Sequence, residues 1–269
     1  WNIIAWPGLA WAKRMFPDLA EDDAQTRLSE AIFMASRVNA EDPVSAWKTH
    51  NQTLKEKREW LNQKDFKEIH FKGPGTDLKV GLADDHEWMG GASMAQNGVI
   101  CNPNIPSEEV FTTPHALRVE GYVSSTKPLS HQGTLIDNIR VVFEKGSITD
   151  AKASKGETVL KKVLESDEGA RRLGEVALVP NSSPISNSGL LFYNTLFDEN
   201  AACHIALGQC YSKCFKGETN LSTSEIRERG GNSSMIHIDW MIGSGEIDID
   251  GFRKNGEIVP IFRKGEWVD

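Results

Sequence analysis

The sequence predicts a mixed α+β fold in which an N-terminal helical segment is followed by a β-rich region. Up to about residue 61, apolar residues recur at helical spacing behind residues that favour the start of a helix. From Phe66 onward, short alternating runs are separated by glycine and proline turns. We therefore divide the chain into residues 1–60 and 61–269. Because the chain begins at Trp1, we expect the first part to be the remnant or linker of a missing N-terminal domain.

Two helices are expected in the first part. One covers residues 22–37 behind an acidic first turn, and the other starts at Asp42, an N-cap residue followed by Pro43 at the first helical position. The supporting apolar positions are Leu28, Ile32 and Ala35 in the first helix, and Val44, Trp47, Leu54 and Leu61 in the second. Residues 1–7 are expected to form a strand.

The β-rich part contains short runs with a period of two, which is typical of strands. We expect strands at residues 68–71, 78–82, 117–123, 139–143, 236–242 and 246–250. Two further segments, residues 155–166 and 168–173, are expected to be helical.

Charge and hydropathy restrict the function classes. A net charge of -8 and an isoelectric point near 5.5 argue against the basic face of a nucleic-acid-binding protein. No stretch approaches the roughly 20 consecutive apolar residues that a membrane span needs. We therefore expect a cytoplasmic protein without nucleic-acid or membrane partners.

The four cysteines do not form a recognised zinc motif. Cys203, Cys210 and Cys214 are spaced C-x6-C-x3-C, which is not one of the usual zinc spacings, and Cys101 lies far from them. In a chain of this length without a signal peptide, they indicate buried free thiols and a reducing compartment.

A histidine and an aspartate share one face of the expected strand at residues 236–242. Period-two alternation puts His237 and Asp239 on one side, between two methionines, and an isoleucine-rich row with Trp240 on the other. An enclosed polar pair needs partners, and imidazole and carboxylate are ordinary metal ligands. A strand face open to solvent, or a His–Asp pair satisfied by its own hydrogen bond, explains the same spacing.

A second cluster combines Glu199, His204 and Tyr211. Five residues separate the glutamate from the histidine, and the tyrosine follows seven residues later. His204 and Tyr211 share a face if the segment is helical and do not if it is a strand, and Gly208 leaves both possibilities open. A core histidine with a single hydrogen bond is the alternative to a metal ligand.

Further glutamates lie in apolar or proline-bounded settings. Glu108 and Glu109 follow Pro106, and Glu175 stands at the head of a run of apolar residues. A buried carboxylate is costly unless a cation or hydrogen-bond donors meet it.

Taken together, segments along nearly the whole chain resemble the aminopeptidase T and aminopeptidase S family of metal-dependent, thermophilic-type aminopeptidases. The segments are AKRMFPDL (residues 12–19), DPVSAW (42–47), GTDL (75–78), PSEEVFTTP (106–114), LFDEN (196–200), CH (203–204), HID (237–239) and IDIDG (247–251). Members of this family carry an additional N-terminal domain, so the chain resembles the C-terminal, metal-binding portion.

The resemblance implies a two-metal aminopeptidase that removes the N-terminal residue of peptides through a metal-bridged water. It implies that two divalent ions, Zn, Co or Mn, are bound by six residues, and that the protein is a homodimer. The six residues are Glu109, Glu175, Glu199, His204, His237 and Asp239.

The apolar context of Glu175 makes it our choice for the carboxylate that bridges both ions. We expect Glu109, or its neighbour Glu108, to accept the proton of the attacking water. The resemblance implies that Tyr211 is a catalytic group, and its phenol is suited to donate a hydrogen bond to the developing oxyanion.

Two other function classes fit the same residues. The first is a non-catalytic binding or dimerisation module, a truncated and inactive chain in which tryptophans anchor an interface. The second is a metal-dependent phosphoesterase. The phosphoesterase ranks below both the aminopeptidase and the binding module, because the sequence offers only Arg118, Arg227 and Arg229 as candidate phosphate partners.

Overall fold

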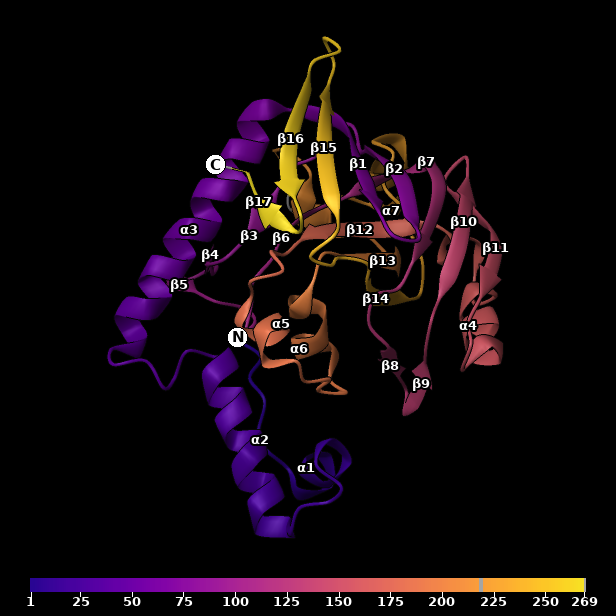
Figure 1. The fold of residues 1–269 in the computed structure, drawn as a ribbon. Coiled ribbons are helices and arrows are strands. Elements are labelled where there is room, and N and C mark those ends of the chain that lie inside the picture. The colour runs from indigo at the N-terminus through magenta and orange to yellow at the C-terminus, as the bar shows by residue number, and fades with distance from the viewer. Residues whose placement is uncertain (218–219, 269) are drawn as a thin grey trace.

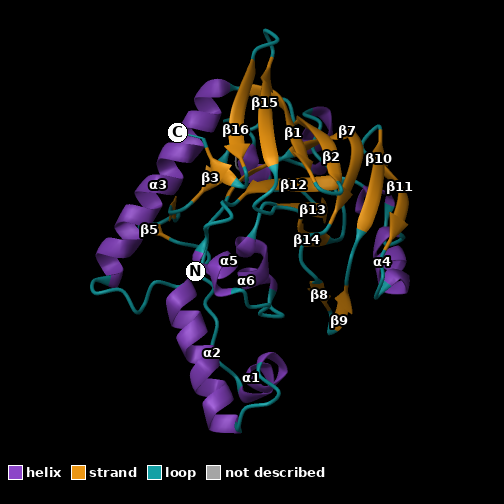
Figure 2. Cartoon of the chain, viewed as in Figure 1, coloured by secondary structure: helices purple, strands orange, loops and turns teal. Residues whose placement is uncertain are grey.

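Two antiparallel sheets share one apolar core in the computed structural model, which describes residues 1–217 and 220–268 (Figures 1 and 2). The larger sheet has the strand order β11-β10-β7-β2-β1-β15-β16-β17. Its strands are β1 (Phe66–Gly73), β2 (Thr76–Leu82), β7 (Pro114–Ser124), β10 (Arg140–Glu144), β11 (Ser147–Lys152), β15 (Asp248–Arg253), β16 (Ile258–Arg263) and β17 (Glu266–Trp267).

The smaller sheet has the order β14-β13-β12-β6-β3 and crosses beneath the larger one (Figure 1). Its strands are β3 (Met89–Gly90), β6 (Val110–Thr112), β12 (Leu173–Leu178), β13 (His204–Gly208) and β14 (His237–Met241). Two short ribbons complete the described strands, formed by β4 (Ser93–Met94) with β5 (Ile100–Cys101) and by β8 (Leu129–His131) with β9 (Thr134–Ile136).

Three helices precede the sheets, which fits the mixed α+β class; the second and third are the two that the sequence predicts, and the first was not expected. They are α1 (Leu9–Met15), α2 (Glu21–Ala35) and α3 (Pro43–Lys64). The side chain of Asp42 accepts a hydrogen bond from the Ser45 amide at 3.1 Å, so the predicted N-cap is confirmed. Helix α3 runs through residue 60 without a break and therefore marks no boundary there. The division into residues 1–60 and 61–269 stays a prediction.

Short helical elements connect the later strands. They are α4 (Glu157–Leu164), α5 (Pro184–Ser188), α6 (Thr195–Asp198), α7 (Thr223–Glu228) and the 3-10 turns η1 (Glu168–Arg171), η2 (Glu199–Ala201) and η3 (Ser212–Cys214). A second apolar core joins α1 and α2 to the α5–α6 region, where Leu28 and Ile32 lie in one cluster with Phe192 and Phe197. The N-terminal helices are therefore anchored on a segment that is distant in sequence.

Two sequence-based expectations were wrong. Residues 1–7 form only one isolated bridge, between Ile3 and Asn104, and Trp1 and Trp6 are largely exposed. A strand there lacks a neighbour that would satisfy its backbone groups. Residues 168–173 are also not one helix, because η1 ends at Arg171 and the chain enters β12 at Leu173.

The cysteine prediction is largely confirmed. All four thiols are free, and Cys203, Cys210 and Cys214 are buried while Cys101 is half-buried. In the part of the chain that the structure describes, the helices are too short or too polar to cross a membrane.

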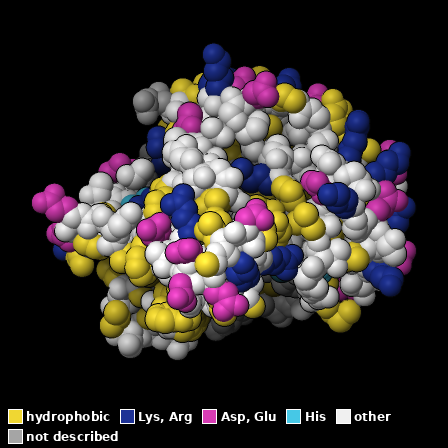
Figure 3. Space-filling view, turned by 60° about the horizontal axis from the view of Figure 1, so that its bottom comes forward, with side chains coloured by type: hydrophobic (Ala, Val, Ile, Leu, Met, Phe, Trp, Pro, Cys, Tyr) yellow, Lys and Arg dark blue, Asp and Glu magenta, His cyan; other side chains and the backbone are white. Residues whose placement is uncertain are grey.

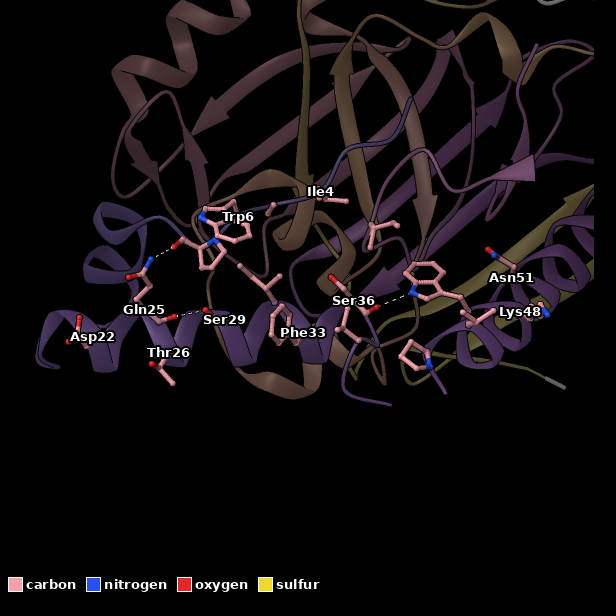
Figure 4. A pocket seen from close by; sticks show the side chains of 18 residues that line it. Ile4, Trp6, Asp22, Gln25, Thr26, Ser29, Phe33, Ser36, Lys48 and Asn51 are labelled. Carbon is pink, nitrogen blue, oxygen red and sulfur yellow. Dashed lines mark hydrogen bonds between the residues drawn. The ribbon is translucent and has the colours of Figure 1, made fainter. Parts of the chain in front are cut away.

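A large apolar groove, with a volume of about 950 Å³, lies between the N-terminal residues and helices α2 and α3. Figure 4 shows Trp6 and Ile4 on one side of this groove and Phe33 of α2 on the other. The Gln25 amide holds the N-terminal residues by donating a hydrogen bond to the Pro7 carbonyl at 2.8 Å. On the face shown in Figure 3, hydrophobic side chains gather in patches among acidic and basic side chains.

Candidate metal centre

Three strands of the smaller sheet, β12, β13 and β14, direct polar side chains away from the main core. Val176 of β12, Ile205 of β13 and Trp240 of β14 belong to that core. Since successive side chains of a strand point to opposite faces, Glu175, His204, His237 and Asp239 emerge on the other face. Glu109 immediately precedes β6 on the same side. The predicted facing of the segment around His237 and Asp239 is therefore confirmed.

Cross-strand pairing brings these side chains together. Ala206 at the centre of β13 pairs with Glu175 on one side and with Asp239 on the other. Ala177 of β12 pairs with His204 in the neighbouring row. The two small alanines leave space above the sheet, and the longer polar side chains on either side extend into that space.

The donor atoms form two groups that share one residue. Oxygen and nitrogen atoms of Glu109, Glu175 and His204 all lie within 4.8 Å of one another, and so do those of Glu175, His237 and Asp239. The Nε2 atom of His204 lies 3.0 Å from Glu109 Oε2 and 3.7 Å from Glu175 Oε1. The Nε2 atom of His237 lies 3.6 Å from Glu175 Oε2 and 3.4 Å from Asp239 Oδ1. Glu175 thus has one carboxylate oxygen toward each group.

Two glycines make this register possible. The pairing of β12 with β13 shifts between Leu173 and Glu175, so Gly174 forms a bulge there. A Cβ atom on Gly174 would lie 2.3 Å from the Gln209 carbonyl oxygen. Gly208 ends β13 with a φ of +102°, and its Cβ would lie 2.1 Å from the Ile236 carbonyl oxygen. Only glycine fits both positions without moving the backbone.

Both histidines are held in the tautomer that a metal requires. His204 Nδ1 lies 3.1 Å from the Ala202 carbonyl oxygen, and His237 Nδ1 lies 2.7 Å from the Gln209 carbonyl oxygen. A carbonyl only accepts, so each Nδ1 carries a proton and donates it, which leaves Nε2 as the atom that faces the carboxylates and can bind a metal in place of a proton. Backbone support of this kind is typical of metal-binding histidines.

The buried Nε2 of His204 tests whether a metal fits the site. It is fully buried and, although Glu109 Oε2 is near, the geometry is not that of a hydrogen bond, so this atom lacks a hydrogen-bond partner among the described residues. A buried imidazole nitrogen surrounded by carboxylate oxygens needs a proton or a metal cation between them. The donor set therefore fits a divalent metal.

The electrostatics of the pocket lead to the same conclusion. Burial and the neighbouring carboxylates of Glu109 and Asp239 outweigh the lowering effect of His204 and together raise the pKa of Glu175 to about 7. Burial lowers the pKa of His237, but the nearby carboxylates of Asp239 and Glu175 outweigh it and raise that pKa to about 9. Carboxylates and imidazoles thus crowd together in a buried pocket and shift one another's pKa values, which is an environment suited to a bound cation.

Glu199 lies in the same pocket but outside both donor groups. It stands at the start of η2, after helix α6. Burial, followed by the charges of Asp239 and Glu109, raises its pKa well above the usual value. The structure brings five of the six expected ligands into the two donor groups and puts the sixth at their edge.

Tyr211 lies at the site, although the segment that joins it to His204 is not the helix that would put both residues on one face. The segment from His204 is a strand, and the chain turns after Gly208 so that Tyr211 lies immediately before η3. Its ring packs against His237, with 4.9 Å between ring centroids, and against Phe111 at 5.9 Å. Loss of water around the phenol, together with the charges of Glu175 and Asp239, raises the pKa of Tyr211, so the hydroxyl keeps its proton.

The structure separates the adjacent glutamates 108 and 109. Glu109 points into the pocket, whereas the carboxylate of Glu108 forms a bidentate pair with Arg37. Sequence reasoning missed Arg37 and its neighbour His50, because 71 residues separate Arg37 from Glu108 and no local pattern signals the contact.

The donor groups line a cavity of about 430 Å³. Met89, Phe111 and Tyr211 contribute apolar surface to it, and Lys213 and Ser107 contribute polar groups. The groove beside α2 is larger, but the described metal-donor groups converge only in the smaller cavity. We therefore assign the candidate site to the smaller cavity.

Comparison with known proteins finds relatives along the whole chain. The chain is 54% identical over 268 residues to aminopeptidase T of Thermus aquaticus and 48% identical over 268 residues to aminopeptidase 2 of Geobacillus stearothermophilus, in each case covering 100% of this chain and 65% of the relative. The chain thus spans about 65% of the length of these curated relatives.

A solved structure, wild-type AmpT from Thermus thermophilus, has a TM-score of 0.93 and 50% sequence identity to this chain. The match covers 100% of this chain and 65% of that one. The family model described as thermophilic metalloprotease (M29) matches residues 1–267. The chain belongs to the thermophilic metalloprotease (M29) family.

Proposed function

We propose that the protein is a metallo-aminopeptidase that hydrolyses the N-terminal residue from peptides at a centre of two divalent metal ions. The observation that carries this proposal is the pair of donor groups that share Glu175. A carboxylate with one oxygen toward each group is the arrangement expected of a bridging ligand. The aminopeptidase names of the relatives support the reaction class.

Five residues would hold the ions: Glu109 and His204 on one side, His237 and Asp239 on the other, and Glu175 between them. Glu199 is retained as a sixth ligand only as a prediction. When bound, two divalent ions supply Lewis-acid polarisation of the scissile carbonyl and lower the pKa of a water toward neutrality. Zinc, cobalt and manganese all accept imidazole and carboxylate ligands.

Two side chains of the pocket are suited to move or hold a proton. The Glu109 carboxylate is an acceptor for the proton of the attacking water, whereas the Arg37 pair occupies both carboxylate oxygens of Glu108. Tyr211 remains a phenol because its pKa is raised, so it can donate a hydrogen bond to the oxygen on which negative charge develops.

The alternative, a non-catalytic binding or dimerisation module, has less support. It leaves the buried, unpartnered Nε2 of His204 and the crowded carboxylates without explanation. Metal analysis separates the two functions, since a module of this kind needs no ion at His237 and Asp239.

The proposal extends to the setting of the enzyme. We propose that it acts as a homodimer on peptides with a free N-terminus, as the family resemblance implies, and that it works in the cytoplasm. The free and mostly buried thiols agree with a reducing compartment.

The test combines metal analysis with a peptidase assay. Purified protein should contain divalent metal, and it should release p-nitroaniline from aminoacyl-p-nitroanilides in a metal-dependent manner. His237→Ala should lose both properties. His115→Ala is the matched control, since His115 lies outside both donor groups, and it should keep both. Full activity of the metal-free protein would refute the proposal.

A further inference from the structure

A buried ion pair lies directly behind the candidate metal centre. Arg37 follows helix α2, and its guanidinium meets the Glu108 carboxylate through two bonds, Nη1 to Oε1 at 2.5 Å and Nη2 to Oε2 at 2.8 Å. The Arg37 side chain is 17% exposed and that of Glu108 is 4% exposed. This bidentate geometry fixes the direction of the carboxylate as well as its position.

His50 of α3 extends the pair. Arg37 Nη2 lies 3.1 Å from His50 Nδ1, and because a guanidinium only donates, Nδ1 is the acceptor. The ring proton is then on Nε2, which donates to the Ser107 carbonyl at 2.7 Å. One histidine thereby ties the guanidinium to the backbone of the residue that precedes Glu108.

The backbone of Glu108 is held from the opposite side. Its amide donates to Oδ1 of the fully buried Asn200 at 2.6 Å. Asn200 is fixed in turn, because its Nδ2 donates to the Leu196 carbonyl at 2.9 Å and its own carbonyl accepts from Ser183 Oγ at 3.0 Å. Side chain, amide and preceding carbonyl of Glu108 are therefore all bonded to buried or half-buried groups.

These bonds determine where Glu109 can point. On its other side, Val110 starts β6 and pairs with Leu178 of β12. Glu109 is thus the single residue between Glu108 and Val110, both of which are fixed. The side chain of Glu108 is directed to Arg37, and the side chain of Glu109 is directed to His204. A ligand residue constrained in this way loses less conformational freedom when it binds a metal.

We propose that Arg37 and Glu108, assisted by His50, form a positioning pair that holds the Glu109 carboxylate at the metal centre. Replacing a buried ion pair by apolar groups often leaves stability unchanged or raises it, so stability alone does not account for this one. The inference rests on the metal centre of the proposed function. It also gives residues 1–60 a role in the site, since Arg37 and His50 both come from that segment.

The test measures metal affinity rather than turnover. Apo protein is titrated with Zn²⁺ against a chromophoric chelator, and the apo melting temperature is recorded in parallel. Loss of support around a metal ligand typically costs 10–100-fold in affinity. We expect a loss of about that size at one of the two sites in both Arg37→Met and Glu108→Gln.

Arg263→Met is the control, because Arg263 also forms a short guanidinium–carboxylate pair, at 2.5 Å from Asp250, but outside the pocket. Its zinc affinity should stay within about twofold of the wild type. If Arg37→Met does not fold, the double variant Arg37→Met/Glu108→Met decides, since it leaves no buried charge unpaired.

The inference would be overturned if the folded single or double variants bound zinc as tightly as the wild type and differed from it only in melting temperature. Wild-type protein that binds zinc but cleaves no peptide would overturn the proposed function and leave the positioning pair intact. Wild-type protein that binds no zinc would overturn both.

Discussion

The substitution Glu175→Gln should have opposite effects on stability and on metal binding. Glu175 is 4% exposed, and burial raises its pKa to about 7 from an ordinary value of 4.5. The folded apo protein therefore holds a proton that the unfolded chain releases between these two pH values. Its stability falls as pH rises through this window, and the full cost is present above pH 7.

The size of the effect follows from the pKa difference. The interval between the ordinary pKa of 4.5 and the folded pKa of about 7, at about 1.36 kcal/mol per pH unit, amounts to ~3 kcal/mol. Glutamine has nearly the same shape and carries no charge. We compare the free energy of unfolding of the metal-free Gln variant with that of the metal-free wild type. The variant's advantage should be up to ~3 kcal/mol greater at pH 8.5 than at pH 4.5.

Urea denaturation in EDTA at the two pH values measures this difference, and zinc titration measures the loss of binding. Glu246→Gln, at an exposed carboxylate, is the control and should show no pH-dependent change in relative stability. A Gln variant whose advantage does not grow with pH, or which still binds two zinc ions at wild-type affinity, would refute the shared-carboxylate reasoning.

Three further perturbations test other parts of the account. Tyr211→Phe should lower kcat by about 10²–10³ at unchanged metal content, as expected when one oxyanion donor is lost, and steady-state kinetics with metal analysis checks it. Ala206→Leu should fill the space between Glu175 and Asp239, so that zinc titration shows weaker binding while denaturation shows a loss of about 1–3 kcal/mol. Burial lowers the pKa of His86, so below about pH 6.5 the unfolded chain takes up a proton that the folded chain does not. His86→Gln should therefore lose less stability than the wild type between pH 7.5 and pH 5.5 in urea denaturation, and parallel curves would contradict this.

Local periodicity was enough to predict the main elements and one face of the site. The Asp42-Pro43 start of α3 and the alternation of His237 and Asp239 against Trp240 depend only on neighbouring residues, and both are confirmed. The predicted helix at residues 168–173 failed because a four-residue turn and a strand that starts at Leu173 carry too little periodic signal to be told apart.

The remainder of the site depends on contacts that a sequence pattern does not encode. Glu108 and Glu109 are chemically identical neighbours, and only the distant Arg37 distinguishes them. Tyr211 approaches His237 because the chain turns after Gly208, which the seven-residue spacing from His204 does not reveal. Strand pairing, which puts Ala206 between two carboxylates, likewise becomes visible only in the folded chain.

The central claim is that one carboxylate, that of Glu175, serves two metal ions. A crystal structure of the cobalt-loaded protein, with anomalous diffraction at the cobalt edge, tests it most directly. The account predicts two anomalous peaks, one beside Glu109 and His204 and one beside His237 and Asp239, each with a Glu175 oxygen at coordination distance. A single peak, or two peaks of which one lies away from Glu175, would contradict it.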